Sequence, residues 1–429
     1  MLTRQRHLIA TALFAGLSTS AAFAAAMPTP PPEAAAIPNP YYVDPNSTAV
    51  NPLGRSWADA FPTLQQALAV ANSSDWIVVA EGDYFPGTST TNTFLIPEGV
   101  FLRGGFVPGD LPTQPTGADT ILSGDIDGDG LPAGNSQHVV TIVGGFGTPT
   151  VLQDVTVKQG NAIGTGNAAN GAGLHVQNTN LWLLDCVISD HNADNHGAGI
   201  YAARGELHLS RCDVANNKAD GKGAGVYCDG PVFDAYNCKI GSNIAVTRGG
   251  GVFVKGGDAE DVQFMNCYFL FNRADKGSCV LVGSGSEATI TNCTMRGNDV
   301  FAGGQGVGVF AAAGASALID NTIIWENSGA LPLEGNGSFR VRYSDIEDAA
   351  WLAHSATNFF VDPVFVGSVN NCDLDPLSPL KDQGDNGRIA LDNVDLDGDV
   401  IYNEPTPVDI EENDRVIDGT VEVGACEIL

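Results

Sequence analysis

Basic residues are scarce in this sequence, with 20 Lys and Arg against 50 Asp and Glu and a formal net charge of −30. A surface this negative repels nucleic-acid phosphates and anionic lipid, so we expect neither nucleic acid nor a charged bilayer as a partner. Beyond the N-terminus no apolar run is long enough to span a membrane, and no transmembrane segment is expected. With 52 glycines and 23 prolines in 429 residues, the chain also falls short of a low-complexity or collagen-like composition.

The first two dozen residues have the features of a secretory signal peptide. Arg4 and Arg6 precede a short apolar stretch over residues 8–17, and Ala22-Phe23-Ala24 forms a small-x-small cleavage site. We predict a signal peptide over residues 1–24 and a Pro/Ala-rich linker over residues 25–40. The mature protein is therefore expected to be exported, as a secreted, extracellular or cell-surface protein.

Zinc-binding Cys-x-x-Cys or Cys/His spacing is absent, although the chain has nine cysteines. Five of them are separated by 26, 26, 29 and 26 residues, which indicates an internal repeat: Cys186, Cys212, Cys238, Cys267 and Cys293. If this column points inward, the thiols fill the core as small apolar side chains. Cα atoms stacked one strand spacing apart also lie within disulfide range, so an oxidised pair stays open as the alternative.

Other positions recur in the same frame. Apolar residues stand five and three positions before each cysteine and two after it, which is the alternation of a strand, then a corner and a second strand. The residues three positions before are Leu183, Leu209, Ala235, Phe264 and Ile290. Small-residue motifs begin eleven positions after the cysteine, at Gly197, Gly223, Gly249 and Gly304. Asparagine, which tolerates left-handed backbone and stacks its amides, recurs at Asn217, Asn243, Asn272, Asn298 and Asn327.

The repeat predicts an all-β fold: a right-handed, single-stranded parallel β-helix, or solenoid, in which equivalent positions stack about 4.8 Å apart on successive turns. Units of 22 to 31 residues hold short strands and leave no room for a helix. The first turn needs a cap, and residues 63–71 (TLQQALAVA) form the one clear amphipathic helix. We predict an N-terminal cap over 41–75, the β-helix over 76–347 and an irregular, loop-rich C-terminal cap over 348–429, in a monomer.

These residues resemble a known group of proteins. The segments YYVDP, GRSW, TLQQALAVA and DWIVVAEGDYFPG are similar to the start of secreted bacterial right-handed parallel β-helix proteins of the pectin-lyase-like superfamily. The C-terminal elements resemble its choice-of-anchor Q class: Asn358-Phe-Phe-Val-Asp-Pro, Asp375-Pro-Leu-Ser-Pro, Asp395-Leu-Asp-Gly and Glu422-Val-Gly-Ala-Cys-Glu. The Gly-Gly-Gly-Val-Phe and Phe-Leu-Phe-Asn elements are similar to chlamydial polymorphic membrane proteins. The resemblance implies the fold and export, and it spans lyases, hydrolases and non-enzymatic surface proteins. Because the chain ends soon after the last element, we expect no autotransporter domain or terminal anchor helix.

Four basic residues precede the small-residue motifs on consecutive turns: His196, Lys222, Arg248 and Lys276. The resemblance implies a role for them, because in pectate-lyase-like enzymes an Arg or Lys removes a proton beside a uronate carboxylate that calcium holds on Asp side chains. By this analogy Lys222 or Arg248 is the base, His196 and Lys276 bind substrate, and Asp194 and Asp220 hold the calcium. The alternative is a solvated turn whose charges balance their neighbours. Polygalacturonase signatures (NxD, adjacent Asp-Asp, GHG, RxK) do not assemble in the coil.

Two acidic loops have the spacing of calcium ligands. Asp125-x-Asp127-x-Asp129-Gly130 copies the first half of an EF-hand loop, with Ser136 at the twelfth position in place of the bidentate Glu. Asn393-x-Asp395-x-Asp397-Gly398 has Glu404 at that position and is the fuller match. Neither loop is flanked by obvious helices, so both are expected to be isolated calcium loops. Ca²⁺ is therefore the cofactor that the sequence predicts.

Two classes of function stay open. The first is a non-enzymatic exported β-helix that presents a long rigid face to a polysaccharide or to a component of the cell surface or envelope. The alternative is a polysaccharide lyase or hydrolase that acts on acidic polysaccharide with calcium. The lack of an assembled catalytic signature favours the first class, and the sequence does not identify the ligand.

Overall fold

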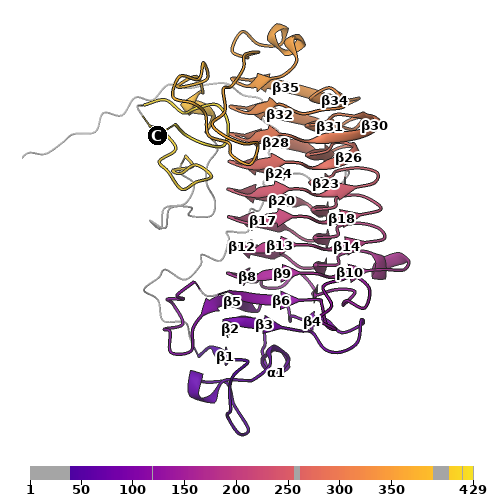
Figure 1. The fold of residues 1–429 in the computed structure, drawn as a ribbon, viewed down its shortest axis with the longest axis vertical. Helices are drawn as coiled ribbons and strands as arrows, with labels where there is room; N and C mark the ends of the chain where they lie inside the picture. The colour runs from indigo at the N-terminus through magenta and orange to yellow at the C-terminus, as the bar shows by residue number, and fades with distance from the viewer. Residues whose placement is uncertain (1–38, 118, 256–260, 390–404, 418, 429) are drawn as a thin grey trace, which may run out of the picture.

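The computed structural model describes residues 39–117, 119–255, 261–389, 405–417 and 419–428. It confirms the predicted fold class, because the chain winds into a parallel β-solenoid in which each turn stacks on the one before it (Figure 1). The predicted signal peptide and all but the last two residues of the predicted linker lie outside the described residues. No helix in the described part of the chain is long and apolar enough to cross a membrane.

Four parallel sheets run along the axis of the solenoid. Sheet A has eleven strands, in spatial order β1 (Tyr41–Val43), β2 (Trp76–Ala80), β5 (Phe101–Phe106), β8 (Thr150–Gln153), β12 (Leu181–Leu184), β16 (Leu207–Ser210), β20 (Val232–Tyr236), β24 (Asp261–Met265), β28 (Glu287–Thr291), β32 (Ser316–Asp320) and β35 (Ser338–Arg342). Sheet B has ten strands, β3 (Gly82–Tyr84), β6 (Thr120–Ser123), β9 (Thr156–Lys158), β13 (Val187–Ser189), β17 (Asp213–Ala215), β21 (Lys239–Gly241), β25 (Tyr268–Leu270), β29 (Thr294–Arg296), β33 (Ile323–Trp325) and β36 (Asp345–Ile346).

The other two sheets complete each turn. The short sheet has six strands, β10 (Asn161–Ala162), β14 (Asn192–Ala193), β18 (Lys218–Ala219), β22 (Ile244–Ala245), β26 (Arg273–Lys276) and β30 (Asp299–Gln305). Sheet C has nine strands, β4 (Phe94–Leu95), β7 (Val140–Val143), β11 (Leu174–Gln177), β15 (Ile200–Ala203), β19 (Val226–Asp229), β23 (Val252–Val254), β27 (Val280–Val282), β31 (Val309–Ala311) and β34 (Leu333–Gly335). The helical elements are η1 (Trp57–Asp59), α1 (Leu64–Leu68), η2 (Gly166–Ala169), η3 (Ala349–Ala353) and η4 (Asn386–Arg388).

The inward rows of sheet A are continuous, as the alternation of apolar residues predicts. Leu183 pairs with Leu209 and Leu209 with Ala235, and the row continues through Phe264 and Ile290. None of these side chains is more than 1% exposed, and together with the inward rows of sheets B and C they form one apolar core inside the tube. Each large side chain contributes about 1.5–3 kcal/mol only while a neighbouring turn covers it, so the turns stabilise one another.

The cysteine column points into this core, which confirms its predicted role as small apolar filling. All five thiols of the column are free and at most 2% exposed, and no oxidised pair forms among them. Burial raises the pKa of the Cys238 thiol well above its usual value, so the sulfur stays protonated and unreactive.

The asparagine column forms a hydrogen-bonded ladder of side-chain amides. Asn243 Nδ2 donates to Asn272 Oδ1 at 3.1 Å, and Asn243 Oδ1 accepts from Asn217 Nδ2 at 3.0 Å. Asn243 Nδ2 also donates to the backbone carbonyl of Val214 at 2.8 Å. The left-handed backbone at these turns belongs to the residue before each asparagine, for example Ser242 with φ 55°. The amides therefore stack as predicted and also satisfy backbone groups, while the left-handed conformation is taken by the preceding residue.

One predicted glycine column is displaced in a late turn. Gly223 adopts φ 60°, where a Cβ would lie 2.3 Å from the carbonyl oxygen of Val226, so glycine is required there. The equivalent residue near the C-terminal end is Gly306 with φ 62°, because Val309 pairs with Val280 in sheet C. The prediction of Gly304 for this column is wrong, since β30 is longer than the other strands of the short sheet and shifts the motif by two residues.

A short helix covers the open first turn, as predicted, although α1 is shorter than the amphipathic segment. Leu64, Ala67 and Leu68 of α1 are buried against the apolar core. β1 precedes this helix and pairs in parallel with β2, so the residues before the helix also add a strand to sheet A.

The chain after β36 first closes the last turn and then runs back along the solenoid (Figure 1). Trp351 of η3 packs edge-on against Phe339 of β35. We name the described residues of 362–428 the C-terminal segment. This segment hydrogen-bonds to an asparagine at each of three turns between sheets A and B: Asn237 with Asp409, Asn266 with Val408 and Asn321 with Asp385.

Candidate functional site

Aromatic rings stack along the outer face of sheet C. The rings of His175, Tyr201, Tyr227 and Phe253, on β11, β15, β19 and β23, are separated by 5.3, 5.2 and 5.3 Å between centroids. The parallel register requires this stacking, because these residues are direct partners on successive strands. Tyr227 is 6% exposed and Phe253 is 5% exposed. This aromatic ladder is therefore a covered layer and not an open platform for a ligand.

The four basic residues that the sequence analysis singled out are here named the basic stripe, and His196 and Lys222 of this stripe contact rings of the ladder. Parallel bridges bring the backbones of Lys222, Arg248 and Lys276 together on consecutive turns. The His196 ring stacks on Tyr227 at 4.8 Å, and Lys222 Nζ lies 4.9 Å from the centre of the Phe253 ring. Lys276 Nζ lies 5.3 Å from the Phe310 ring. Each of these three side chains thus covers the ring of the next turn, and the contacts of the two lysines with the rings contribute about 0.5–2 kcal/mol each.

The basic stripe has an unpaired positive centre. Burial lowers the pKa of Lys222, and the charges of Arg248 and Lys255 lower it further. Lys255 pairs with Asp229 at 2.7 Å, whereas no carboxylate of the described residues forms an ion pair with Lys222 or Arg248. Two uncompensated cations therefore stand on adjacent turns of a strongly acidic protein.

His196 differs from the other members of the stripe. Its pKa is lowered by burial and by Lys222, and its Nδ1 accepts a hydrogen bond from the Lys222 backbone N–H at 3.1 Å. The imidazole is therefore neutral at pH 7 and contributes an aromatic ring to the stripe. Lys276 Nζ donates to the neutral Gln305 Oε1 at 2.8 Å and therefore keeps its positive charge, like Lys222 and Arg248.

Asp194 and Asp220 stand at equivalent positions on adjacent turns, because the alanines before them pair in the short sheet. Both are exposed, and Asp194 Oδ2 accepts a hydrogen bond from the backbone N–H of Gly164 at 2.8 Å. The described groups of three or more potential metal-ligating side chains lie elsewhere. The calcium role of this pair stays a prediction, with no third Asp, Glu, His or Cys ligand from the described residues beside it.

Three carboxylates converge in the loop after β6. Ligand oxygens of Asp125, Asp127 and Asp129 lie within 4.8 Å of one another, and oxygen donors suit Ca²⁺. The Asp125 carboxylate is held by the backbone N–H groups of Gly128 and Gly130, at 3.0 and 3.1 Å. The twelfth position, Ser136, is buried, and its hydroxyl donates to the carbonyl of Asn92. The loop therefore fits a weak calcium site with three protein carboxylates. The second predicted loop, with Asn393, Asp395, Asp397 and Glu404, lies outside the described residues.

Calcium at 10 mM is expected to raise the melting temperature by about 1–3 °C, because a site with a millimolar Kd stabilises the fold by about 1.4 kcal/mol. Thermal melts with calcium and with a chelator measure the shift. Asp127→Asn removes it, whereas Asp83→Asn, an exposed acid on β3, keeps it. A shift that survives Asp127→Asn and disappears in Asp395→Asn would assign the calcium to the second loop instead.

A charged group that the sequence analysis missed lies on the outer face of sheet A. His208 Nδ1 is 2.9 Å from Asp234 Oδ2, and His208 Nε2 is 3.7 Å from Glu206 Oε2. Burial lowers the pKa of His208, but the hydrogen bonds and charges of Asp234 and Glu206 outweigh it and raise the pKa to about 9. The histidine is therefore an imidazolium at neutral pH. The available signal was the spacing of 26 residues between His208 and Asp234, which is one repeat and makes them partners in register.

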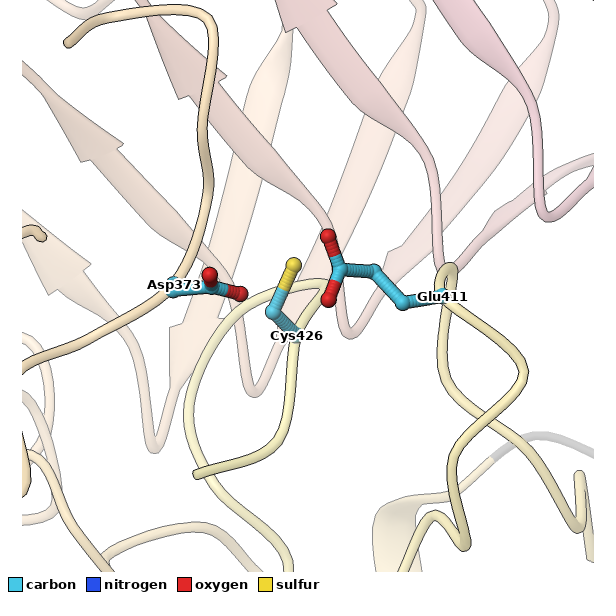
Figure 2. Close-up of side chains that lie close together, drawn as sticks. All are labelled: Asp373, Glu411 and Cys426. Atoms are coloured by element: carbon cyan, nitrogen blue, oxygen red, sulfur yellow. The ribbon is translucent and has the colours of Figure 1, made fainter. Parts of the chain in front are cut away.

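A further group lies where the C-terminal segment crosses sheet B. Asp373, Glu411 and Cys426 offer ligand atoms within 4.8 Å of one another, and Figure 2 shows the two carboxylates on either side of the Cys426 sulfur. Cys426 forms a disulfide with Cys372, with 5.9 Å between the Cα atoms. Sequence reasoning missed this group, because its members come from loops that follow no repeat.

The comparison with family models agrees with the architecture. A family model described as "Right handed beta helix region" matches residues 135–294 and, in an overlapping match, residues 224–375, which together span more than half of the chain. A solved structure, "Crystal structure of pectate lyase Pel9A", is 14% identical with a TM-score of 0.49, over 92% of this chain and 98% of that chain. A likeness at this level says nothing about activity. No curated protein matches the chain.

Proposed function

This chain belongs to the right-handed β-helix family, and we propose that it is an exported, non-enzymatic protein that binds acidic polysaccharide along its basic stripe. The signal-peptide features of residues 1–24 support export. The resemblance of the Glu422–Glu427 element to choice-of-anchor Q proteins supports a secreted or cell-surface location. The expected assembly is a monomer, with a polysaccharide or a cell-surface component as its partner.

The observation that carries the proposal is the unpaired charge of Lys222 and Arg248. A protein with 50 acidic residues has ample carboxylates to neutralise two cations, yet none of those described pairs with them. Their proximity also costs energy, since Arg248 lowers the pKa of Lys222. A carboxylate of a uronate chain laid along the stripe would relieve this repulsion and form charge-assisted hydrogen bonds.

The spacing of the solenoid suits a polymer with repeating charges. Successive turns place Lys222, Arg248 and Lys276 about 4.8 Å apart along the axis, on a rigid face that needs no ordering when a ligand binds. The overall negative charge slows the approach of a polyanion, but this repulsion is screened beyond about 8 Å at physiological ionic strength. Direct contacts to the stripe are therefore expected to dominate once the ligand has arrived.

Polyuronate binding is expected to weaken at least about tenfold in a Lys222→Gln/Arg248→Gln double variant, because two charge-assisted contacts are lost. Affinity electrophoresis or calorimetry with a polygalacturonate measures the effect. The matched control is Lys218→Gln/Lys239→Gln, which removes the same charge from exposed positions on β18 and β21. Equal affinity of the two double variants would contradict the proposal.

A second candidate, a polysaccharide lyase that uses calcium, is favoured by the lowered pKa of Lys222. A lysine that gives up its proton more easily is better suited to act as a general base. Ca²⁺ held by Asp194 and Asp220 would neutralise the uronate carboxylate and acidify the neighbouring C–H. Ultraviolet absorbance of an unsaturated product, followed with a polyuronate panel plus calcium, distinguishes the candidates. A rise that Lys222→Gln abolishes would replace the binding proposal with the lyase.

A further inference from the structure

The Cys372–Cys426 disulfide closes a loop of the C-terminal segment with a sequence separation of 54. Both sulfurs are sheltered, since Cys372 is 5% exposed and Cys426 is 2% exposed, and they pack with Tyr268 and Ile410 against the outer face of sheet B. Glu411, whose carboxylate lies near the Cys426 sulfur, is exposed to solvent.

Two carboxylates flank the same sulfur. Figure 2 shows Asp373 and Glu411 on opposite sides of Cys426, and their ligand atoms lie within 4.8 Å of one another and of its Sγ. The arrangement thus concentrates negative charge at a point that a cation would stabilise.

Reduction would free the Cys426 sulfur beside these two oxygens, and rotation of the Cys372 side chain would bring the second sulfur to them. The resulting set of two thiolates and two carboxylates, four ligands in all, matches the preference of Zn²⁺ for tetrahedral sites built from sulfur, nitrogen and oxygen donors. Zinc–sulfur bonds of about 2.3 Å place two sulfurs of a tetrahedral site roughly 3.8 Å apart. Cα atoms 5.9 Å apart allow this separation through rotation of the two cysteine side chains, without movement of the backbone.

We propose a redox-gated zinc site formed by Cys372, Asp373, Glu411 and Cys426. In the oxidised chain the disulfide cross-links the loop, and in the reduced chain a bound Zn²⁺ cross-links it instead. A phosphine or dithiol reductant supplies two electrons, the S–S bond breaks and each sulfur takes up one proton, while the reductant is oxidised. Zn²⁺ then binds both sulfurs, and the two thiol protons pass to solvent. The proposal stands apart from polysaccharide binding, since none of these residues belongs to the basic stripe.

The full mature chain is titrated with Zn²⁺ by calorimetry, first oxidised and then after reduction with a thiol-free phosphine in the absence of oxygen. We expect about one tightly bound zinc per reduced chain and none per oxidised chain. Co²⁺ as a probe is expected to show sulfur-to-metal charge-transfer absorption in the reduced chain only. Asp373→Asn and Glu411→Gln, which keep both cysteines, are each expected to weaken zinc binding at least about tenfold.

The remaining thiols provide the internal control. A Cys372→Ser/Cys426→Ser variant keeps the seven buried free cysteines and is expected to lose both the zinc and the cobalt signal. Equal zinc binding by oxidised and reduced chains, no binding by the reduced chain, or unchanged affinity in an Asp373→Asn/Glu411→Gln double variant would each overturn the proposal. Circular dichroism of the reduced chain confirms that the solenoid is intact in each titration.

Discussion

Replacing Glu427 with glutamine is expected to destabilise the attachment of the C-terminal segment to the solenoid by about 3–5 kcal/mol. Arg415 Nε lies 3.2 Å from Glu427 Oε1, and both side chains are 0% exposed. Burial lowers the pKa of Arg415 to about 10 against the pull of Asp409 and Glu422, so the guanidinium remains charged at neutral pH. The variant therefore leaves a buried cation whose acceptors are backbone carbonyls such as Ala425.

Hydrogen exchange and limited proteolysis of residues 405–428 measure this loss in the oxidised protein. The control is Arg388→Gln, which breaks a partly exposed pair with Asp385 at 3.4 Å and is expected to cost less than about 1 kcal/mol. An Arg415→Met/Glu427→Leu double variant removes both partners of this pair but leaves the buried Asp409 and Glu422 without the guanidinium, so it is expected to recover only part of the stability. Equal protection in Glu427→Gln and in the wild type would show that the ion pair does not hold the segment.

Replacing Asn243 with alanine is expected to lower the free energy of unfolding of the solenoid by about 3–5 kcal/mol. Asn243 is 0% exposed, and its amide binds both neighbouring rungs of the ladder and the carbonyl of Val214. Alanine removes these bonds and the one that Asn243 Oδ1 accepts from the Asn217 backbone N–H, and each buried hydrogen bond contributes about 0.5–1.5 kcal/mol. The urea midpoint of the transition, with an unchanged slope, measures the loss.

The last rung of the same ladder is the control. Asn327 is only partly buried and has a neighbouring rung on one side, so water can reach the groups that lose their partner and Asn327→Ala is expected to cost less than Asn243→Ala. If both variants unfold at the same urea concentration, the position of an asparagine within the ladder has no influence on its contribution to stability, and the expectation is contradicted.

The inward rows of the solenoid could be predicted because every turn must bury apolar side chains at the same positions. Leu183, Leu209 and Ala235 are apolar residues at equivalent positions of successive turns, so their spacing alone predicts that they stack. The amide ladder follows from the same logic. The displaced glycine column shows the limit, because a few extra residues in β30 shift the motif without changing the composition of the turn.

The contacts of the candidate sites needed the structure. The sequence places Lys222 directly before Gly223, but whether its side chain enters solvent or covers Phe253 depends on the residue that the next turn presents. Arg415 and Glu427 each occur once, in irregular chain, and no period connects them. Asp373 and Glu411 likewise meet only because two loops cross over sheet B. The spacing of a repeat predicts which residues stack on successive turns. It does not predict the contacts of residues that lie outside the repeat.

The regularity of the inner columns has a consequence for folding. A chain threaded one whole winding out of step would still place sulfur over sulfur and amide over amide, because most rungs are interchangeable between neighbouring turns. Such slippage must be rejected by residues that occur once, such as the His208–Asp234 pair and the buried Arg415–Glu427 pair. Charged pairs on the outside of the solenoid therefore fix the register of turns that are otherwise alike.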